Sequence, residues 1–535
     1  MSSKSFLKGA AILGIAGIIV KILGAFFRIP LGNIIGDTGL GYYQASYPIY
    51  VLLLTISTAG IPTAISKLVA EKKAAGDRYG AHKVFRVSFI LLFVTGVVTS
   101  GIVFFGARTI VELIKNPNAY YSMLAVVPAL LFVPVMAAYR GYFQGLQDMT
   151  PTAVSQVIEQ MGRVVVGLGL AYILLDKGPE IASAGAVFGA AAGAIAGTMM
   201  IVYIYHRRRG SILREIQGNL SQNQESSGKI ISRLLAIAVP ITIGAAVIPV
   251  MNMIDVAIVM RRLQEVGFSY EEANSLYGQL TGMAATLINL PQVLTVALAM
   301  SLVPAISEAN QRRDQAGIRS TVQTGTRVTL LIGLPAAVGL VTLSKPIMML
   351  LYPMQTESAL SASGPLAILA FGLVFLTLVQ TFTGILQGLG RPSIPVVNLM
   401  IGSTFKVILT YVLTGIYAIN VKGAAIGTVA AYGVAALLNF FAVRRLTHTT
   451  FHVSQFIVKP IIAVGAMSIS VLFVYKQFLP GLGNQLATVL AIGMGVLIYG
   501  LMLLTTGGIT EKDFEMMPGG GKMAKILRIL GLLRK

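Results

Sequence analysis

Two basic residues lie within the first apolar segment of the chain, where hydrocarbon would surround them if that segment crossed a membrane. Lys21 and Arg28 interrupt the apolar stretch 9–31. A charged side chain at the centre of a bilayer costs about 2.5 to 3.5 kcal/mol on insertion scales, so it is rarely kept without a function. The pair could neutralise an anionic group. Alternatively, Arg28, which closely precedes Pro30, reaches a membrane interface with its head group.

The spacing of this segment places the two cations beside small residues. Gly14, Gly17, Lys21, Gly24 and Arg28 recur at steps of three and four residues and therefore share one face of a helix. Glycine lets another backbone or a bulky ligand approach closely. The pattern predicts a small, cationic helix face.

The composition is that of an integral membrane protein. The chain has 535 residues, of which 55% are hydrophobic and 11% charged, and its mean hydropathy is +0.78; soluble domains carry about 25% charged residues. The absence of cysteine excludes disulfides and thiolate chemistry. The net charge of +21 lies mainly between apolar runs, which indicates membrane topology and no nucleic-acid partner.

Apolar runs long enough to cross about 30 Å of hydrocarbon predict an all-α integral membrane protein with about fourteen transmembrane helices. Lys and Arg, Arg140 among them, are concentrated in alternate loops on the side of the N-terminus, so both termini are expected in the cytoplasm. Tyrosines such as Tyr42, Tyr43, Tyr47, Tyr120 and Tyr121 are expected at a membrane interface. The predicted spans are 9–31, 47–66, 87–107, 119–139, 152–175, 182–205, 234–259, 275–303, 328–350, 363–386, 396–417, 424–443, 458–475 and 485–505.

A weak internal repeat divides these spans into two lobes. The sequence FQGL at 143–146 returns as LQGL at 386–389, and Arg163 matches Lys406 at the same shift. Six spans separate the copies, so the repeat is parallel. The predicted organisation is an N-lobe at 1–205, a basic cytoplasmic linker at 206–233, a C-lobe at 234–443, two extra spans at 458–505, and a cytoplasmic tail at 506–535 with an amphipathic interfacial helix.

The predicted span 152–175 carries a polar stripe. Glu159 and Arg163, with two glutamines, lie on one helical face. Being four residues apart, they either neutralise each other or line a substrate cavity. Lys406 either adds positive potential to that cavity or reaches an interface.

A third polar group lies at the predicted outer end of the span 234–259. Asp255, Arg261 and Arg262 could form a gate or couple transport to an ion, or they could form an ordinary rim ion pair. The histidines form no metal-ligand pattern, and no phosphate-binding Gly-Lys-Ser/Thr loop occurs. We therefore expect no catalytic residue, no metal and no bound cofactor.

Several motifs in order resemble a known family. They are KILG at 21–24 with Arg28, AGIPTAIS at 59–66, PTAVSQ at 151–156, and LVPAIS at 302–307. Together with the layout of six, six and two spans, they resemble the multidrug/oligosaccharidyl-lipid/polysaccharide (MOP) exporter superfamily. Within it, the chain looks like the branch of MurJ-type lipid II flippases and stage V sporulation protein B.

This resemblance implies a transporter, not an enzyme. The expected activity is a flippase that moves undecaprenyl-diphosphate-linked peptidoglycan precursor, lipid II, to the outer leaflet of the bacterial cytoplasmic membrane by alternating access. The resemblance assigns Lys21 and Arg28 to substrate binding in a central cavity. The implied partners are lipid II, the bilayer and the cell-wall synthesis machinery, and Na⁺, H⁺ or the membrane potential could supply energy. Basic residues that some MurJ proteins carry in the second and eighth spans are missing here.

Three alternatives remain open on the sequence. A flippase for another polyprenyl-diphosphate-linked glycan would share the same anionic group. A MATE-like drug or cation antiporter would need a carboxylate-lined cavity, but the predicted spans contain only Glu159 and Asp255 as acids. A membrane-embedded glycan polymerase would need catalytic acids at the outer face, and the acids there form no motif.

Overall fold

The computed structural model describes residues 3–217, 225–451 and 454–509, and within these ranges the regular structure is helical. This confirms the prediction of an all-α membrane protein. Most of the predicted tail at 506–535, including its amphipathic helix, lies outside the described residues. Contacts divide the chain into two compact units: unit 1 is Met1–Gln264 with Phe268–Gly278, and unit 2 is Glu265–Gly267 with Gln279–Lys535.

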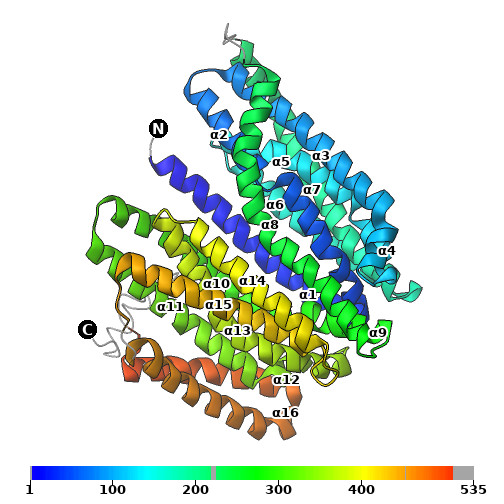
Figure 1. Ribbon diagram of the computed structural model, residues 1–535, viewed down its shortest axis with the longest axis vertical. Coiled ribbons are helices and arrows are strands. Elements are labelled where there is room, and N and C mark those ends of the chain that lie inside the picture. The colour runs from blue at the N-terminus through cyan, green and yellow to red at the C-terminus, as the bar shows by residue number, and fades with distance from the viewer. Residues whose placement is uncertain (1–2, 218–224, 452–453, 510–535) are drawn as a thin grey trace. The chain divides into compact units, whose positions relative to one another are not determined.

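Unit 1 is built around four helices of 36 or more residues, α1, α3, α7 and α8, with shorter helices between them (Figure 1). α6 lies against both α7 and α1, and α5 lies against α3, α7 and α2. The elements are α1 Ser3–Thr58, α2 Ile61–Ala74, α3 Arg78–Leu113, η1 Pro117–Ala119, α4 Tyr120–Ala125, α5 Val127–Gly145, α6 Thr150–Ile173, η2 Leu175–Lys177, α7 Pro179–Gln217, α8 Ser227–Glu265 and α9 Tyr270–Gly278.

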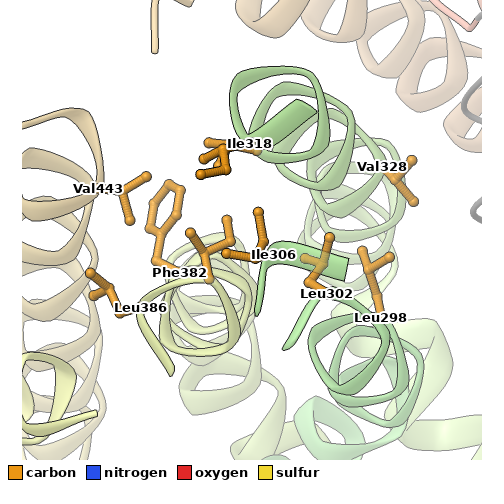
Figure 2. Close-up of a cluster of buried hydrophobic side chains, with 10 residues drawn as sticks. Leu298, Leu302, Ile306, Ile318, Val328, Phe382, Leu386 and Val443 are labelled. Carbon is orange, nitrogen blue, oxygen red and sulfur yellow. The ribbon is translucent and has the colours of Figure 1, made fainter. Parts of the chain in front are cut away.

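Unit 2 packs around α13, which lies against α10, α11 and α15. Figure 2 shows apolar side chains of these four helices gathered in one buried cluster, in which Leu298, Leu302 and Ile306 recur every four residues along α10. The elements are η3 Gln279–Ala284, α10 Ala285–Gln311, α11 Gln315–Thr342, α12 Ser344–Leu351, α13 Thr356–Gly388, α14 Ser393–Thr414, α15 Lys422–Thr447, η4 Ser454–Val458 and α16 Lys459–Thr506.

The described residues contain eleven helical segments that are long and apolar enough to cross a membrane. Two of these segments contain a break, at Gly36 in α1 (φ 66°) and at Gly483 in α16 (φ 71°), where a positive φ favours glycine. α6, which carries the polar stripe, is not among the eleven. The chain is a multi-pass membrane protein, while the count of fourteen spans stays a prediction.

A further break, in addition to those at Gly36 and Gly483, interrupts the predicted span 47–66. α1 ends at Thr58 and α2 begins at Ile61. Gly60, one of the two residues between them, lies close to α8. A Cβ at Gly60 would lie 2.1 Å from the Ala238 carbonyl oxygen, and the Gly60 N–H donates to the Thr242 hydroxyl at 3.1 Å. Only a residue without a side chain permits this approach.

The contact division differs from the predicted lobes at α8. This helix lies in unit 1, whereas the predicted C-lobe began at residue 234. Helical structure also continues through 206–217 and resumes at 227, so the described parts of the predicted linker are largely helical. The lobe boundaries themselves stay predictions.

An ion-pair cluster ties the start of α8 to the end of α2. Glu225, whose side chain is 11% exposed, lies 3.3 Å from both Lys72 and Arg233. Arg233 also contacts Glu71 at 2.6 Å, and Lys72 contacts Asp77 at 3.3 Å. Burial alone would raise the pKa of the Glu225 carboxyl, but hydrogen bonds from Lys72 and Arg233 outweigh it and hold the pKa below its ordinary value.

Replacing Glu225 by Gln is expected to destabilise unit 1 by about 0.5 to 1 kcal/mol at pH 7. Because the folded-state pKa of Glu225 is lowered, its contribution is present above the ordinary glutamate pKa of about 4.3 and is lost as the pH falls below that value through the folded pKa. The difference in unfolding temperature between wild type and Glu225→Gln should therefore be present at pH 7 and shrink at pH 3.5.

The matched control is Glu308→Gln, because Glu308 forms an exposed ion pair with Arg312 and is 63% exposed. This control should change the unfolding temperature little at either pH. An equal loss at both pH values in Glu225→Gln would contradict the electrostatic origin of the effect.

Candidate functional site

Arg28 lies close to Tyr47, although the helix break at Gly36 separates the two residues in the chain. Its guanidinium carbon lies 5.9 Å from the ring centroid of Tyr47. In one straight helix, residues 28 and 47 would be separated by about 28 Å. The two halves of α1 must therefore turn back on each other at Gly36, and this turn brings Arg28 to Tyr47.

A buried polar network holds that turn. The Ser275 hydroxyl donates to the Asp37 carboxylate at 2.6 Å, and the Asn274 side chain donates to the Thr38 carbonyl at 2.8 Å. The Asn116 side chain in turn donates to Asn274 at 2.8 Å. Since Asn116 and Asn274 are fully buried, these bonds replace water that neither group can reach. The network fixes the start of the second half of α1 against α9.

Glu159 on α6 lies between two arginines. Arg140 of α5 donates from Nη2 to Glu159 Oε2 at 2.9 Å and from Nε to the Ser155 hydroxyl at 2.9 Å. Arg163 Nη2 lies 3.8 Å from Glu159 Oε1. The three charged side chains are 15 to 16% exposed. Arg163 Nε is buried and, within the described residues, has no hydrogen-bond partner.

Three tyrosines of α1 line up beside these charges. The rings of Tyr43 and Tyr47 stack at 5.7 Å with an interplanar angle of 17°, and the Tyr50 ring lies 5.9 Å from Tyr47. Tyr47 lies within electrostatic reach of the guanidinium groups of both Arg28 and Arg163. We define the arginine–tyrosine cluster as Arg28, Tyr43, Tyr47, Tyr50, Arg140, Glu159 and Arg163.

Glycines lie at the contact between α1 and α6, and of the two, Gly167 leaves no room for a side chain. A Cβ at Gly24 would lie 3.6 Å from the side-chain nitrogen of Gln160 on α6. At Gly167 of α6 it would lie 2.9 Å from the ring of Phe27. The cationic face of α1 and the polar stripe of α6 were predicted separately, and the structure brings their residues together.

The arginine–tyrosine cluster carries excess positive charge. It holds three guanidinium groups and one carboxylate within helices long enough to lie in a membrane. Lys21 lies two turns before Arg28 on α1 and is exposed, and the neighbouring positions Gly14 and Gly17 face open space. Such an arrangement suits an anionic ligand and is unfavourable for a cationic one.

The remaining predicted residues lie apart from this cluster in the chain. Lys406 is half-buried on α14 in unit 2. Asp255 and Arg262 are half-buried, and Arg261 is exposed, all near the end of α8 in unit 1. Their assignment to substrate binding, gating or ion coupling stays a prediction.

Sequence reasoning missed Arg140 and did not connect the tyrosines with the charged residues. Arg140 was counted among loop cations, but α5 continues to Gly145 and carries it as a helical residue. Tyr42 and Tyr43 were expected at a membrane interface and are 2% and 4% exposed within unit 1. The steps of four and three between Tyr43, Tyr47 and Tyr50 place the three rings on one helical face, which is a signal present in the sequence.

Comparisons with known proteins agree with this architecture. A family model described as Polysaccharide biosynthesis protein matches residues 6–310, and one described as MatE matches residues 280–412. Stage V sporulation protein B of Bacillus subtilis (strain 168) is 27% identical over 532 residues, 98% of this chain and 99% of that protein. Lipid II flippase MurJ of the same organism is 29% identical over 459 residues, 83% of each chain. The uncharacterized membrane protein YabM, also of this organism, is 29% identical over 531 residues, 97% of this chain and 96% of that protein.

Two solved structures show the same fold. An inward-facing MATE family transporter of the MOP superfamily aligns with a TM-score of 0.68 and 15% identity, over 84% of this chain and 98% of that one. Lipid II flippase MurJ in an inward closed conformation aligns with a TM-score of 0.65 and 18% identity, over 92% of this chain and 98% of that one. The relatives and structures with a named activity are flippases and transporters, so the chain is a transporter and not an enzyme. With more than half of its length matched by one family model, the chain belongs to the polysaccharide biosynthesis protein family of the MOP exporter superfamily.

Proposed function

We propose that this transporter is a flippase for lipid II, the undecaprenyl-diphosphate-linked peptidoglycan precursor, and moves it from the inner to the outer leaflet of a bacterial cytoplasmic membrane. The observation that carries the proposal is the excess positive charge of the arginine–tyrosine cluster inside unit 1. The chain is similar to a lipid II flippase over 83% of its length, which supports the same substrate.

The chemistry of the substrate explains why such a cluster is needed. A diphosphate esterified at both ends carries two negative charges, which cannot cross about 30 Å of hydrocarbon without cationic partners. Arginine binds phosphate oxygens through two parallel N–H groups, which adds geometric selectivity to the charge. The prenyl tail can remain in lipid while the sugars hydrogen-bond within the protein. In this proposal Lys21 and Arg28 bind the diphosphate, and Arg163 and Lys406 contribute further positive charge.

We infer that transport proceeds by alternating access, with both termini in the cytoplasm. The end of α8, with Asp255, Arg261 and Arg262, is the candidate gate or ion-coupling site. Energy would come from Na⁺, H⁺ or the membrane potential, and cell-wall synthesis proteins are candidate partners. No bound cofactor is part of this mechanism.

Depleting the protein in its host, with any redundant flippase also removed, tests the substrate directly. The amount of lipid-linked peptidoglycan precursor in the outer leaflet is measured with an enzyme or toxin that acts only from outside. We expect that amount to fall severalfold while precursor accumulates on the inner side, and to recover when the chain is expressed again. Undiminished outward precursor would refute lipid II as the substrate.

A second candidate is a flippase for another polyprenyl-diphosphate-linked glycan. The family model is described as Polysaccharide biosynthesis protein, and a probable low-salt glycan biosynthesis flippase of Haloferax volcanii is 26% identical over 230 residues, 42% of this chain and 46% of that protein. The diphosphate group would be shared, so the same cationic cluster would serve. In the depletion experiment this candidate predicts loss of a surface glycan with peptidoglycan precursor unchanged.

A further inference from the structure

The two arginines beside Glu159 are not equivalent. Arg140 makes a charge-assisted hydrogen bond to Glu159 at 2.9 Å and a second bond to Ser155, so its head group is held from two sides. Arg163 approaches the same carboxylate only to 3.8 Å, beyond hydrogen-bond distance. The Glu159 charge is therefore matched chiefly by Arg140. The guanidinium of Arg163 keeps its positive charge and a buried Nε without a partner among the described residues.

Tyr47 is the side chain that Arg163 shares with Arg28. It lies within electrostatic reach of both guanidinium groups, and Arg28 lies over its ring at 5.9 Å. The partial negative charge of a phenolic oxygen attracts a nearby guanidinium, and a cation within about 6 Å of a ring centroid is attracted to the ring face. Tyr47 thus offsets the repulsion between two cations that arrive from different helices.

The neighbouring rings fix Tyr47 in place. Tyr43 stacks on it at 5.7 Å, and Tyr50 lies 5.9 Å away on the next turn. Both neighbours are buried, which leaves the Tyr47 ring little freedom to rotate.

We propose that Tyr47 is a positioning residue that holds the Arg28 and Arg163 guanidinium groups as a pair, so that one arginine meets each phosphate of a diphosphate diester. This inference rests on the proposed function and deepens it. It assigns the substrate class by charge: two paired cations favour a diphosphate-linked lipid over a monophosphate-linked one, which needs only one of them.

Tyr47→Phe separates this role from packing. The substitution keeps the ring that stacks on Tyr43 and that faces Arg28, and it removes only the oxygen that both arginines share. The matched control is Tyr203→Phe on α7, which removes a hydroxyl from a tyrosine that lies outside the cluster and is 60% exposed. The full chain is purified into nanodiscs, and its unfolding temperature is measured without ligand.

Binding is measured with two probes: a short-chain prenyl diphosphate N-acetylglucosamine and the corresponding prenyl monophosphate N-acetylglucosamine. We expect Tyr47→Phe to weaken binding of the diphosphate probe by about tenfold and that of the monophosphate probe by less than about twofold. Tyr203→Phe should bind both probes within about twofold of wild type. The unfolding temperature of the two variants should match that of wild type.

Two outcomes would overturn the positioning role: equal binding of the diphosphate probe by wild type and Tyr47→Phe, or an equal loss for both probes. If Tyr47→Phe does not yield folded protein, Arg163→Gln provides the second test. That variant should lose the preference for diphosphate while Arg28 retains monophosphate binding, and an unchanged preference would overturn the pairing. A wild-type protein that binds neither probe would instead refute the proposed function itself.

Discussion

The double variant Lys21→Ala/Arg28→Ala is expected to abolish transport of the diphosphate-linked substrate, with a loss of at least about 100-fold, while the amount of protein in the membrane stays the same. A charge-assisted contact to a desolvated phosphate contributes about 3 kcal/mol, which corresponds to roughly 100-fold in binding or rate. Arg28 lies in the arginine–tyrosine cluster, and Lys21 is exposed two turns away on the same helix. The measurement is rescue of outward precursor in depleted cells.

The control for this variant removes the same two residue types elsewhere. Lys67 and Arg312 belong to exposed ion pairs, with side chains 60% and 74% exposed. Lys67→Ala/Arg312→Ala changes the net charge equally and should transport like wild type. Full rescue by the Lys21/Arg28 variant would refute their assignment to substrate binding.

Gly278→Ala is expected to destabilise unit 1 by about 3 kcal/mol and to lower the yield of folded protein. A Cβ at Gly278 would lie 2.0 Å from the Asp37 carbonyl oxygen and 2.7 Å from the Gly41 nitrogen. Both contacts are backbone atoms at the turn of α1, where partly buried hydrogen bonds from Asn274 and Ser275 oppose any shift. No flexible side chain can yield, so the strain falls on the turn that brings Arg28 to Tyr47.

The comparison is Gly101→Ala on α3, where an added Cβ would meet nothing within 4 Å. This control should leave the unfolding temperature unchanged or raise it, since alanine in an unstrained helix gains up to about 1 kcal/mol over glycine. The measurements are the unfolding temperature in detergent and the yield of folded protein for both variants. Equal behaviour of the two variants would contradict the steric account of Gly278.

Much of the candidate site could be read from the sequence because the signals are local. Lys21 and Arg28 stand out against an apolar background, and Glu159 and Arg163 share a helical face by spacing alone. Hydropathy likewise identified the chain as a helical membrane protein, and the ordered motifs placed it in the MOP superfamily.

The rest depends on contacts between residues far apart in the chain. The contact between Arg28 and Tyr47 requires the turn at Gly36. The sequence of an apolar segment does not show which of its glycines reverses the direction of the chain. Arg140 was assigned to a loop because the apolar run ends at Tyr139, whereas α5 continues to Gly145 and Arg140 bonds to Glu159 and Ser155 from within this helix. Contacts with residues distant in the chain therefore determine where Arg28 and Arg140 lie.

The polar stripe of α6 also affects how the chain enters the bilayer during synthesis. Because α6 is not among the segments apolar enough to cross by themselves, its transfer into lipid is costly until Glu159 and Arg163 have partners. Those partners, Arg140 on α5 and Tyr47 on α1, are both synthesised earlier. The order of helices along the chain thus supplies the polar surroundings before α6 emerges from the ribosome, so stable insertion of this helix depends on the helices that precede it.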